Sequence, residues 1–150
     1  MSVLIFAFRG TNSELIARGL GKYGEVNIID SSVEAIDELV AHSGLREYTY
    51  VLGMGQYSGR DHDRIRIETQ CSSRFRHRDA KHEVLHIPTF FNEDNDLKYA
   101  RGMGNSWCNF VSYRIVGAHP QRAYTFLHVP KQFETARAVR AVQRHIDILR

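Results

Sequence analysis

The apolar run SVLIFAF, residues 2–8, decides the fold, and the neighbouring segments extend what it indicates. A nearly unbroken apolar run of this length is typical of a strand that is buried on both faces of a sheet. The polar segment RGTN at 9–12 then predicts a loop, in which Thr11 or Asn12 caps a helix that runs toward Tyr23. A buried strand followed by a capped helix is the first half of a βαβ unit.

The same alternation continues over the first 60 residues. We expect a second strand at 26–29, followed by a helix whose apolar positions lie within 33–40 and which ends at Gly44. A third strand at 48–52 should then run into a glycine-rich loop at 53–59. This pattern is typical of a parallel sheet with helices on both faces. Beyond these residues we expect an edge or antiparallel strand at 65–70, a strand at 84–87 and a polar loop at 92–96. A helix should follow from 105 or 106 to 116, then a strand at 124–129 and a last helix from 131 to 149. The sequence therefore predicts an α/β fold: one three-layer α/β/α domain over residues 1–150 with a mostly parallel central sheet, of the phosphorylase or hydrolase kind.

Composition limits the class of protein. The chain has 150 residues, of which 43% are hydrophobic and 25% are charged, close to the averages for soluble domains. No apolar run approaches the ~20 residues that span a bilayer, and we find no pattern of a cleaved leader. Two cysteines, Cys71 and Cys108, are too few for a disulfide framework. We therefore expect a cytoplasmic protein that is not associated with a membrane.

Charge is unevenly distributed along the chain. Residues 1–50 hold 4 basic and 7 acidic groups, residues 51–100 hold 8 of each, and residues 101–150 hold 8 basic and 2 acidic groups. Such asymmetry can mark a surface for nucleic acid, but it is more often the solvated face of a terminal helix. Nucleic acid is therefore not the partner that we expect.

Three residues from separate segments can form a nucleophilic site. Ligands of an open parallel sheet bind at the carboxyl ends of its strands, and Glu68 and His128 fall near such ends. Cys108 lies in the first turn of the helix that we expect from 105 or 106, where the helix dipole favours a thiolate with a pKa below the ~8.5 of a free thiol. On spacing alone, a buried cysteine, a core histidine and an exposed glutamate remain the commoner interpretation.

Short sequence motifs strengthen the catalytic interpretation. GNSWCNFVSY at 104–113 resembles the nucleophile segment of pyroglutamyl peptidase I, the pyrrolidone-carboxylate peptidases, and FLHVP at 126–130 is similar to the histidine motif of that family. LGMGQ at 52–56, with GR at 59–60 and IRIE at 65–68, resembles the family's glycine-glutamine segment and the strand with its glutamate. FAF at 6–8 is similar to the family's N-terminal strand. The four blocks cover nearly the whole chain in the family's order.

This resemblance implies a cysteine peptidase that removes an N-terminal pyroglutamyl or related acyl group from a peptide and needs no cofactor or metal. Cys108 would be the nucleophile, His128 the general base and later the general acid, and Glu68 the carboxylate that orients the imidazole. Gln56 would line the substrate pocket, and the segment 8–10 (Phe8, Arg9 and Gly10) would form the wall against which the ring packs. Ungapped counting places the family's oxyanion-side arginine at Arg78, with Arg74 and Arg76 close to it in sequence. A homo-oligomer is compatible with the resemblance.

The chain also departs from the family. Only 40 positions separate Glu68 from Cys108 (108 − 68), and the family's loop after the first strand is reduced to Arg9-Gly10-Thr11. An unpaired Arg9 beside the ring would favour an acidic or differently shaped acyl group. The histidines at 62, 77, 82 and 86 lack the partners of a metal site. Two alternatives remain: a non-catalytic binding protein that recognises an acidic ligand or nucleic acid through the arginine-rich C-terminal third, and a nucleoside-phosphorylase-like enzyme, for which we find no clear phosphate loop.

Overall fold

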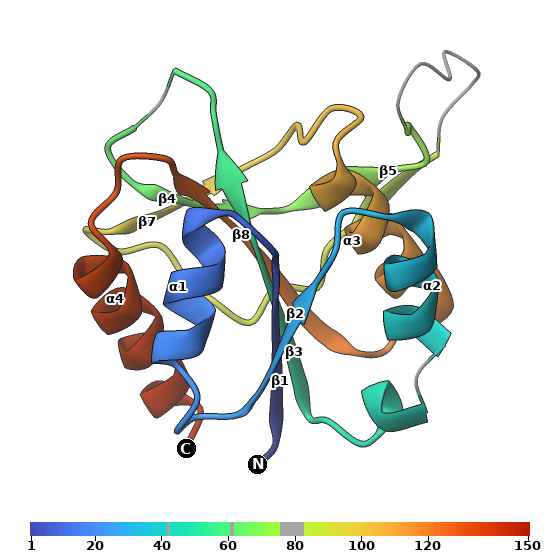
Figure 1. Ribbon diagram of the computed structural model, residues 1–150, viewed down its shortest axis with the longest axis horizontal. Coiled ribbons are helices and arrows are strands. Elements are labelled where there is room, and N and C mark those ends of the chain that lie inside the picture. The colour runs from blue at the N-terminus through green and yellow to red at the C-terminus, as the bar shows by residue number, and fades with distance from the viewer. Residues whose placement is uncertain (42, 61, 76–82) are drawn as a thin grey trace.

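Helices and strands alternate along a sheet that runs through the middle of the molecule (Figure 1). The computed structural model describes residues 1–41, 43–60, 62–75 and 83–150. The main sheet contains β1 (Val3–Phe8), β2 (Glu25–Ile29), β3 (Tyr50–Tyr57), β4 (Ile65–Glu68), β7 (Leu97–Ala100) and β8 (Ala123–Pro130). The helices are α1 (Asn12–Gly19), α2 (Val33–Ala41), α3 (Trp107–Ala118) and α4 (Thr135–Ile148), with a short 3₁₀ turn at Ser43–Arg46. None of the helices in these ranges is long and apolar enough to cross a membrane.

The six strands lie in the order β2-β1-β3-β8-β4-β7. All neighbouring pairs are parallel except β4 and β8, which run in opposite directions. A separate two-stranded sheet is formed by β5 (Gln70–Ser72) and β6 (Val84–His86). The predicted three-layer α/β/α architecture with a mostly parallel sheet is therefore confirmed.

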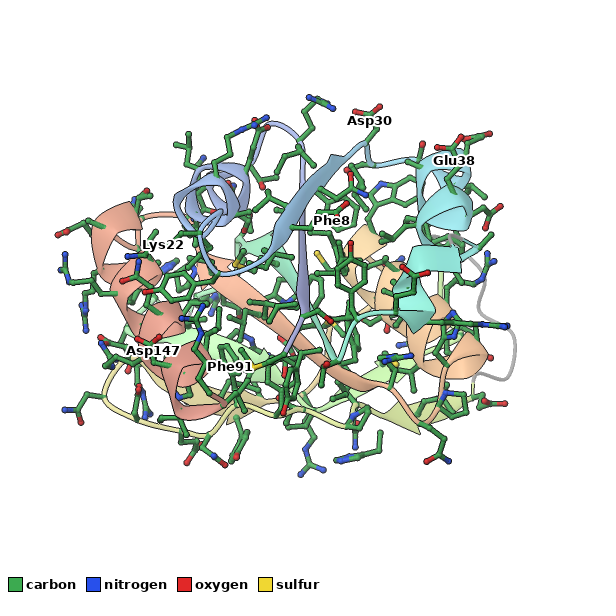
Figure 2. All side chains as sticks on the ribbon, turned by 90° about the horizontal axis from the view of Figure 1, so that it is seen from below. Phe8, Lys22, Asp30, Glu38, Phe91 and Asp147 are labelled. Atoms are coloured by element: carbon green, nitrogen blue, oxygen red, sulfur yellow. The ribbon has the colours of Figure 1, made fainter. Side chains whose placement is uncertain are left out.

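Alternation along the central strands divides the core into two halves. On β1, the odd residues Val3, Ile5 and Ala7 pack with α1 and α4, whereas the even residues Leu4, Phe6 and Phe8 pack with α2 and α3. This is the period of two that places successive side chains on opposite faces of a sheet. Figure 2 shows the same division, with α1 and α4 on one side of the sheet and α2 and α3 on the other.

Three expectations about local structure were wrong. The segment 53–59 is not a loop from its first glycine, because β3 continues through Gly53 and Gly55 to Tyr57. The strand expected at 65–70 is split into β4 and β5, and the edge strand β7 falls where no strand was predicted.

The arginines of α4 form ion pairs within the chain. Arg137 and Arg144 both contact the Asp96 carboxylate, at 2.6 and 2.7 Å, and Arg144 also contacts Asp94 at 3.2 Å. These pairs fasten the polar loop before β7 to α4. Much of the positive charge in the C-terminal third therefore has an acidic partner, which leaves less of it for an external anion.

We expect Asp96→Asn to lower stability by about 1–3 kcal/mol, because two charge-assisted hydrogen bonds are weakened. In a chain of this size that corresponds to a fall in Tm of roughly 3–10 °C, measured by thermal unfolding. Burial opposes ionisation of Asp96, but the hydrogen bonds from Arg144 and Arg137 leave its pKa below the ordinary value. The stabilisation is therefore present above the pKa of Asp in the unfolded chain, about 4, and is lost as the pH falls through the folded pKa. Asp147→Asn, at an exposed position of α4, is the control; equal losses in both variants would contradict this prediction.

Candidate active site

Side chains from three neighbouring strands converge on the face of the sheet that α3 covers. Because Ile65 and Ile67 of β4 point toward α1 and α4, Arg66 and Glu68 point to the opposite face. On β8, Leu127 and Val129 likewise belong to the α1 and α4 side, so that His128 shares the face of Glu68. The strand register pairs His128 with Gly55 of β3 on one side and with Arg66 of β4 on the other.

His128 and Glu68 form a direct hydrogen bond in the interior. The distance from His128 Nδ1 to Glu68 Oε1 is 2.9 Å, and Glu68 is fully buried. Burial alone would raise the pKa of Glu68, but the hydrogen bonds and charges of His128 and Arg66 bring that pKa below its usual value. An ionised carboxylate can only accept, so His128 Nδ1 donates the proton. A neutral imidazole then carries its lone pair on Nε2, which is free to act as a base.

Cys108 approaches the same place from α3. Ser106 caps this helix by accepting a hydrogen bond from the Asn109 N–H at 3.2 Å, which fixes Cys108 in the first turn. A Cβ atom added to Gly55 would lie only 2.3 Å from Cys108 Sγ. The sulfur therefore rests against the backbone of the residue that is paired with His128. The structure thus brings Cys108, His128 and Glu68 to one face of the sheet.

The predicted low pKa of Cys108 was wrong. Burial raises the pKa of the Cys108 thiol to about 12, and the negative charge of Glu68 adds to the rise. The backbone N–H at the helix start and the Ser106 side chain act in the opposite direction but do not offset burial. Cys71 is equally buried and its pKa is also raised to about 12, so that the resting charge does not distinguish the two thiols. Sequence reasoning placed Cys108 at a helix start but overlooked how little water reaches it there.

The loop after β1 is tied to the ends of two other strands. The Asn12 backbone N–H donates to Gln56 Oε1 at 3.1 Å, and Asn12 Nδ2 donates to the Pro130 carbonyl at 3.0 Å. Gly10 has a φ of +79°, a left-handed conformation that favours glycine in this short turn. Gln56 and Gly10 therefore both lie close to strand ends on the same edge of the sheet.

The other predicted wall residues have different surroundings. Phe8 is 3% exposed and packs in the core with α2 and α3. Arg9 was expected to be unpaired, and this was wrong: its Nε contacts Asp30 Oδ1 at 2.8 Å, with both side chains more than half exposed. Asp30 points away from the body of the molecule in Figure 2. Arg74 is exposed, and Arg76 and Arg78 lie outside the described residues.

Sequence reasoning missed the role of Asn109. Its side chain accepts a hydrogen bond from the Ser72 N–H at 2.7 Å and donates to the carbonyls of Ser72 and Arg74 at 3.0 and 2.6 Å. These bonds fasten β5 to the start of α3, beside Cys108. The signal was present in the Cys-Asn pair, because an amide can satisfy backbone donors and acceptors together. Within the described ranges, no group of three or more His, Cys, Asp or Glu side chains is placed to hold a metal ion.

Several solved structures of pyroglutamyl and pyrrolidone carboxyl peptidases share this architecture. Pyroglutamyl peptidase I of Bacillus amyloliquefaciens matches with a TM-score of 0.77 at 14% sequence identity, covering 97% of this chain and 94% of its own. The chain has the pyroglutamyl peptidase fold. The pyrrolidone carboxyl peptidase of Thermococcus litoralis matches with a TM-score of 0.74 at 14% identity, over 98% of this chain and 92% of its own. A variant of the Pyrococcus furiosus pyrrolidone carboxyl peptidase matches with a TM-score of 0.67 at 16% identity, over 99% and 97%.

Comparison of sequences alone does not identify this similarity. No protein-family model matches the chain, and no curated protein matches it. The chain thus has the pyroglutamyl peptidase fold at only 14–16% sequence identity to these enzymes.

Proposed function

We propose that this protein is a cysteine peptidase of the pyroglutamyl peptidase type, which removes an N-terminal pyroglutamyl or related acyl group from a peptide. The observation that carries the proposal is the His128–Glu68 hydrogen bond of 2.9 Å on the face of the sheet where Cys108 Sγ rests against Gly55. A nucleophile, a base and a group that orients the base are the minimum for acyl transfer through a covalent intermediate. The fold shared with pyroglutamyl peptidases supports the same reaction class. We propose the cytoplasm, a reducing compartment, as its location.

In the proposed mechanism Cys108 begins as a thiol, because burial keeps its pKa far above neutral pH. His128 Nε2 takes the thiol proton as Sγ attacks the acyl carbonyl, and the Glu68 carboxylate stabilises the imidazolium that forms. The tetrahedral intermediate collapses to a thioester, and the departing amine takes its proton from His128. A water molecule, deprotonated by His128, then hydrolyses the thioester and releases Cys108.

Groups that bind the oxyanion and the acyl group would complete the reaction. Backbone N–H groups in the first turn of α3 are fixed donors beside Cys108 and are suited to an oxyanion. The resemblance implies that Arg78 assists them, with Phe8, Arg9 and Gly10 beside the acyl group. Gln56 Oε1 is already used by the Asn12 N–H, which fixes the carboxamide and leaves its Nε2 to donate to an acyl carbonyl. Arg9 is paired with Asp30, so a neutral ring meets no unpaired charge from it.

Hydrolysis of a pyroglutamyl fluorogenic amide tests the proposal. We expect measurable kcat/KM on this substrate and at least tenfold lower values on prolyl and glutamyl amides. A prolyl group lacks the lactam carbonyl and leaves the hydrogen-bond donor of the site unpaired, and a glutamyl group brings an extra charge into the site. Hydrolysis of none of the three by the folded protein would refute the peptidase. Salt-sensitive binding of RNA or DNA by that inactive protein would instead favour the binding-protein alternative.

Glu68→Gln is expected to lower kcat/KM by roughly 10³–10⁴-fold, because an amide can donate to Nδ1 and stabilise the wrong imidazole tautomer. It is also expected to lower Tm, because Arg66 would lose the anion that its buried guanidinium contacts at 2.9 Å. Steady-state kinetics and thermal unfolding measure the two effects. The exposed Glu34→Gln on α2 serves as the control. Full activity in Glu68→Gln would remove Glu68 from the mechanism.

A further inference from the structure

Arg66 contacts the same carboxylate oxygen as His128. Its Nε donates to Glu68 Oε1 at 2.9 Å, and His128 Nδ1 reaches that oxygen at 2.9 Å from the other side. The Arg66 side chain is only 12% exposed, so the contact is shielded from solvent. Arg66 and Glu68 lie two residues apart on β4 and therefore share a face of the sheet.

Tyr57 holds the guanidinium in place. The Arg66 guanidinium carbon lies 4.5 Å from the centroid of the Tyr57 ring, and Arg66 Nη1 is 3.5 Å from the Tyr57 hydroxyl. Gly59 permits this position of the ring, because a Cβ atom there would lie 2.0 Å from the hydroxyl. The ring of Tyr57 is also 5.8 Å from that of His128. Arg66 is thus fixed by a cation–π contact on one side and a carboxylate on the other.

Glu68 needs a second positive partner at this depth. Its carboxylate is fully buried, and Oε2 has no hydrogen-bond partner among the residues that the structure describes. Besides His128 of β8 and Arg66, the described groups around Glu68 include the Cys108 thiol of α3 and the Tyr57 phenol of β3, neither of which is cationic. A neutral imidazole supplies a hydrogen bond but no charge. Within the described part of the chain, Arg66 is therefore the permanent positive charge that contacts this carboxylate.

We propose that Arg66, clamped by Tyr57, is a positioning residue that keeps Glu68 ionised and thereby fixes the His128 tautomer that can accept the Cys108 proton. The role in catalysis rests on the proposed function, whereas the effect on Glu68 and His128 does not. Without Arg66 the buried carboxyl would take up a proton more readily and could donate it to Nδ1. His128 would then carry its own proton on Nε2, where it cannot act as a base.

Arg66→Met tests the effect on charge, because methionine fills much of the same space without the cation. The Glu68 carboxyl is followed by ¹³C NMR titration and the His128 tautomer by ¹⁵N NMR, with Glu68→Gln and His128→Gln used for assignment. In Arg66→Met we expect the pKa of Glu68 to rise toward neutral pH, because the cation no longer offsets burial, and the Nδ1–H tautomer to give way to Nε2–H as the carboxyl takes up its proton. Arg66→Lys should retain most of the wild-type titration, because it keeps the charge.

Arg64→Met is the matched control, since Arg64 lies two residues earlier and contacts the exposed Asp63 at 3.7 Å. It should leave both NMR signals and Tm unchanged. An unchanged Glu68 titration and His128 tautomer in Arg66→Met would overturn the proposal, whether or not the protein is a peptidase. If the wild-type chain lacks peptidase activity, the proposed function fails while these spectra still decide the role of Arg66.

A double-mutant cycle separates positioning from a general loss of structure. We expect Arg66→Met to lower kcat/KM at least tenfold in the wild-type background but less than threefold in the Glu68→Gln background, because Arg66 acts through Glu68. The double variant should also recover part of the Tm that each single variant loses, since neither buried charge is left alone. Equal activity losses in both backgrounds would contradict action through Glu68. If Arg66→Met does not fold, Arg66→Gln and the folded double variant carry the same comparison.

Discussion

Cys108→Ala is expected to reduce hydrolysis of a pyroglutamyl amide by roughly 10⁴–10⁶-fold, the scale at which removal of a catalytic nucleophile acts. The fold should survive, because the change deletes a single sulfur atom that is packed against Gly55. The measurement is kcat/KM together with Tm, so that lost chemistry is distinguished from lost structure.

Cys71→Ser is the matched control for this variant. Cys71 is as deeply buried as Cys108 and its pKa is raised to the same value, but its Sγ lies 3.8 Å from the Leu85 carbonyl between β5 and β6. A hydroxyl can donate to that carbonyl, so the folded Cys71→Ser protein should keep its activity. Comparable inactivation of both variants would mean that neither thiol is a specific nucleophile.

Gly55→Ala is expected to lower kcat/KM by displacing Cys108. The new methyl group would lie 2.3 Å from Cys108 Sγ and 3.1 Å from Phe126 Cζ, so the sulfur or the start of α3 has to move. A displacement of about 1 Å at the reacting atoms can cost roughly 100-fold in rate, and overpacking a core costs about 1–3 kcal/mol in stability. We therefore expect kcat/KM to fall roughly 100-fold, when measured well below the Tm of the variant.

Gly117→Ala provides the opposite case on the helix that carries Cys108. A Cβ at Gly117 meets no atom within 4 Å, and alanine favours a helix over glycine by about 0.5–1 kcal/mol. This variant should be fully active and slightly more stable. If Gly55→Ala were as active as Gly117→Ala, Cys108 Sγ would not rest against Gly55 in solution.

The sequence predicts the framework better than the environment of the site. The apolar run of β1 and the alternation after it were enough for the layers, because burial on both faces leaves a strand little choice of residue. Glu68, Cys108 and His128 were chosen as candidate site residues from short sequence motifs and from the expected start of a helix. Their convergence depends on pairing between segments that are 60 residues apart, which no local pattern encodes.

Other features were beyond reach for physical reasons. The pKa of Cys108 depends on how much water the fold excludes, and the partner of Arg9 is Asp30, which lies 21 residues away. By contrast, the shared face of Arg66 and Glu68 could have been read from the alternation of IRIE, in which the two charged residues alternate with isoleucines.

The antiparallel contact between β4 and β8 affects the stage of folding at which the candidate site is assembled. It joins Arg66 to His128 and Ile67 to Leu127, and only when it forms does Glu68 reach the imidazole. Contacts between distant segments carry a large loop-closure entropy and slow the folding of a domain. A chain that has formed only its first βαβ unit, from β1 to β2, does not yet contain the hydrogen bond between His128 and Glu68. In a newly synthesised chain this pair therefore forms only after the C-terminal third, which carries β8, has been made and has docked.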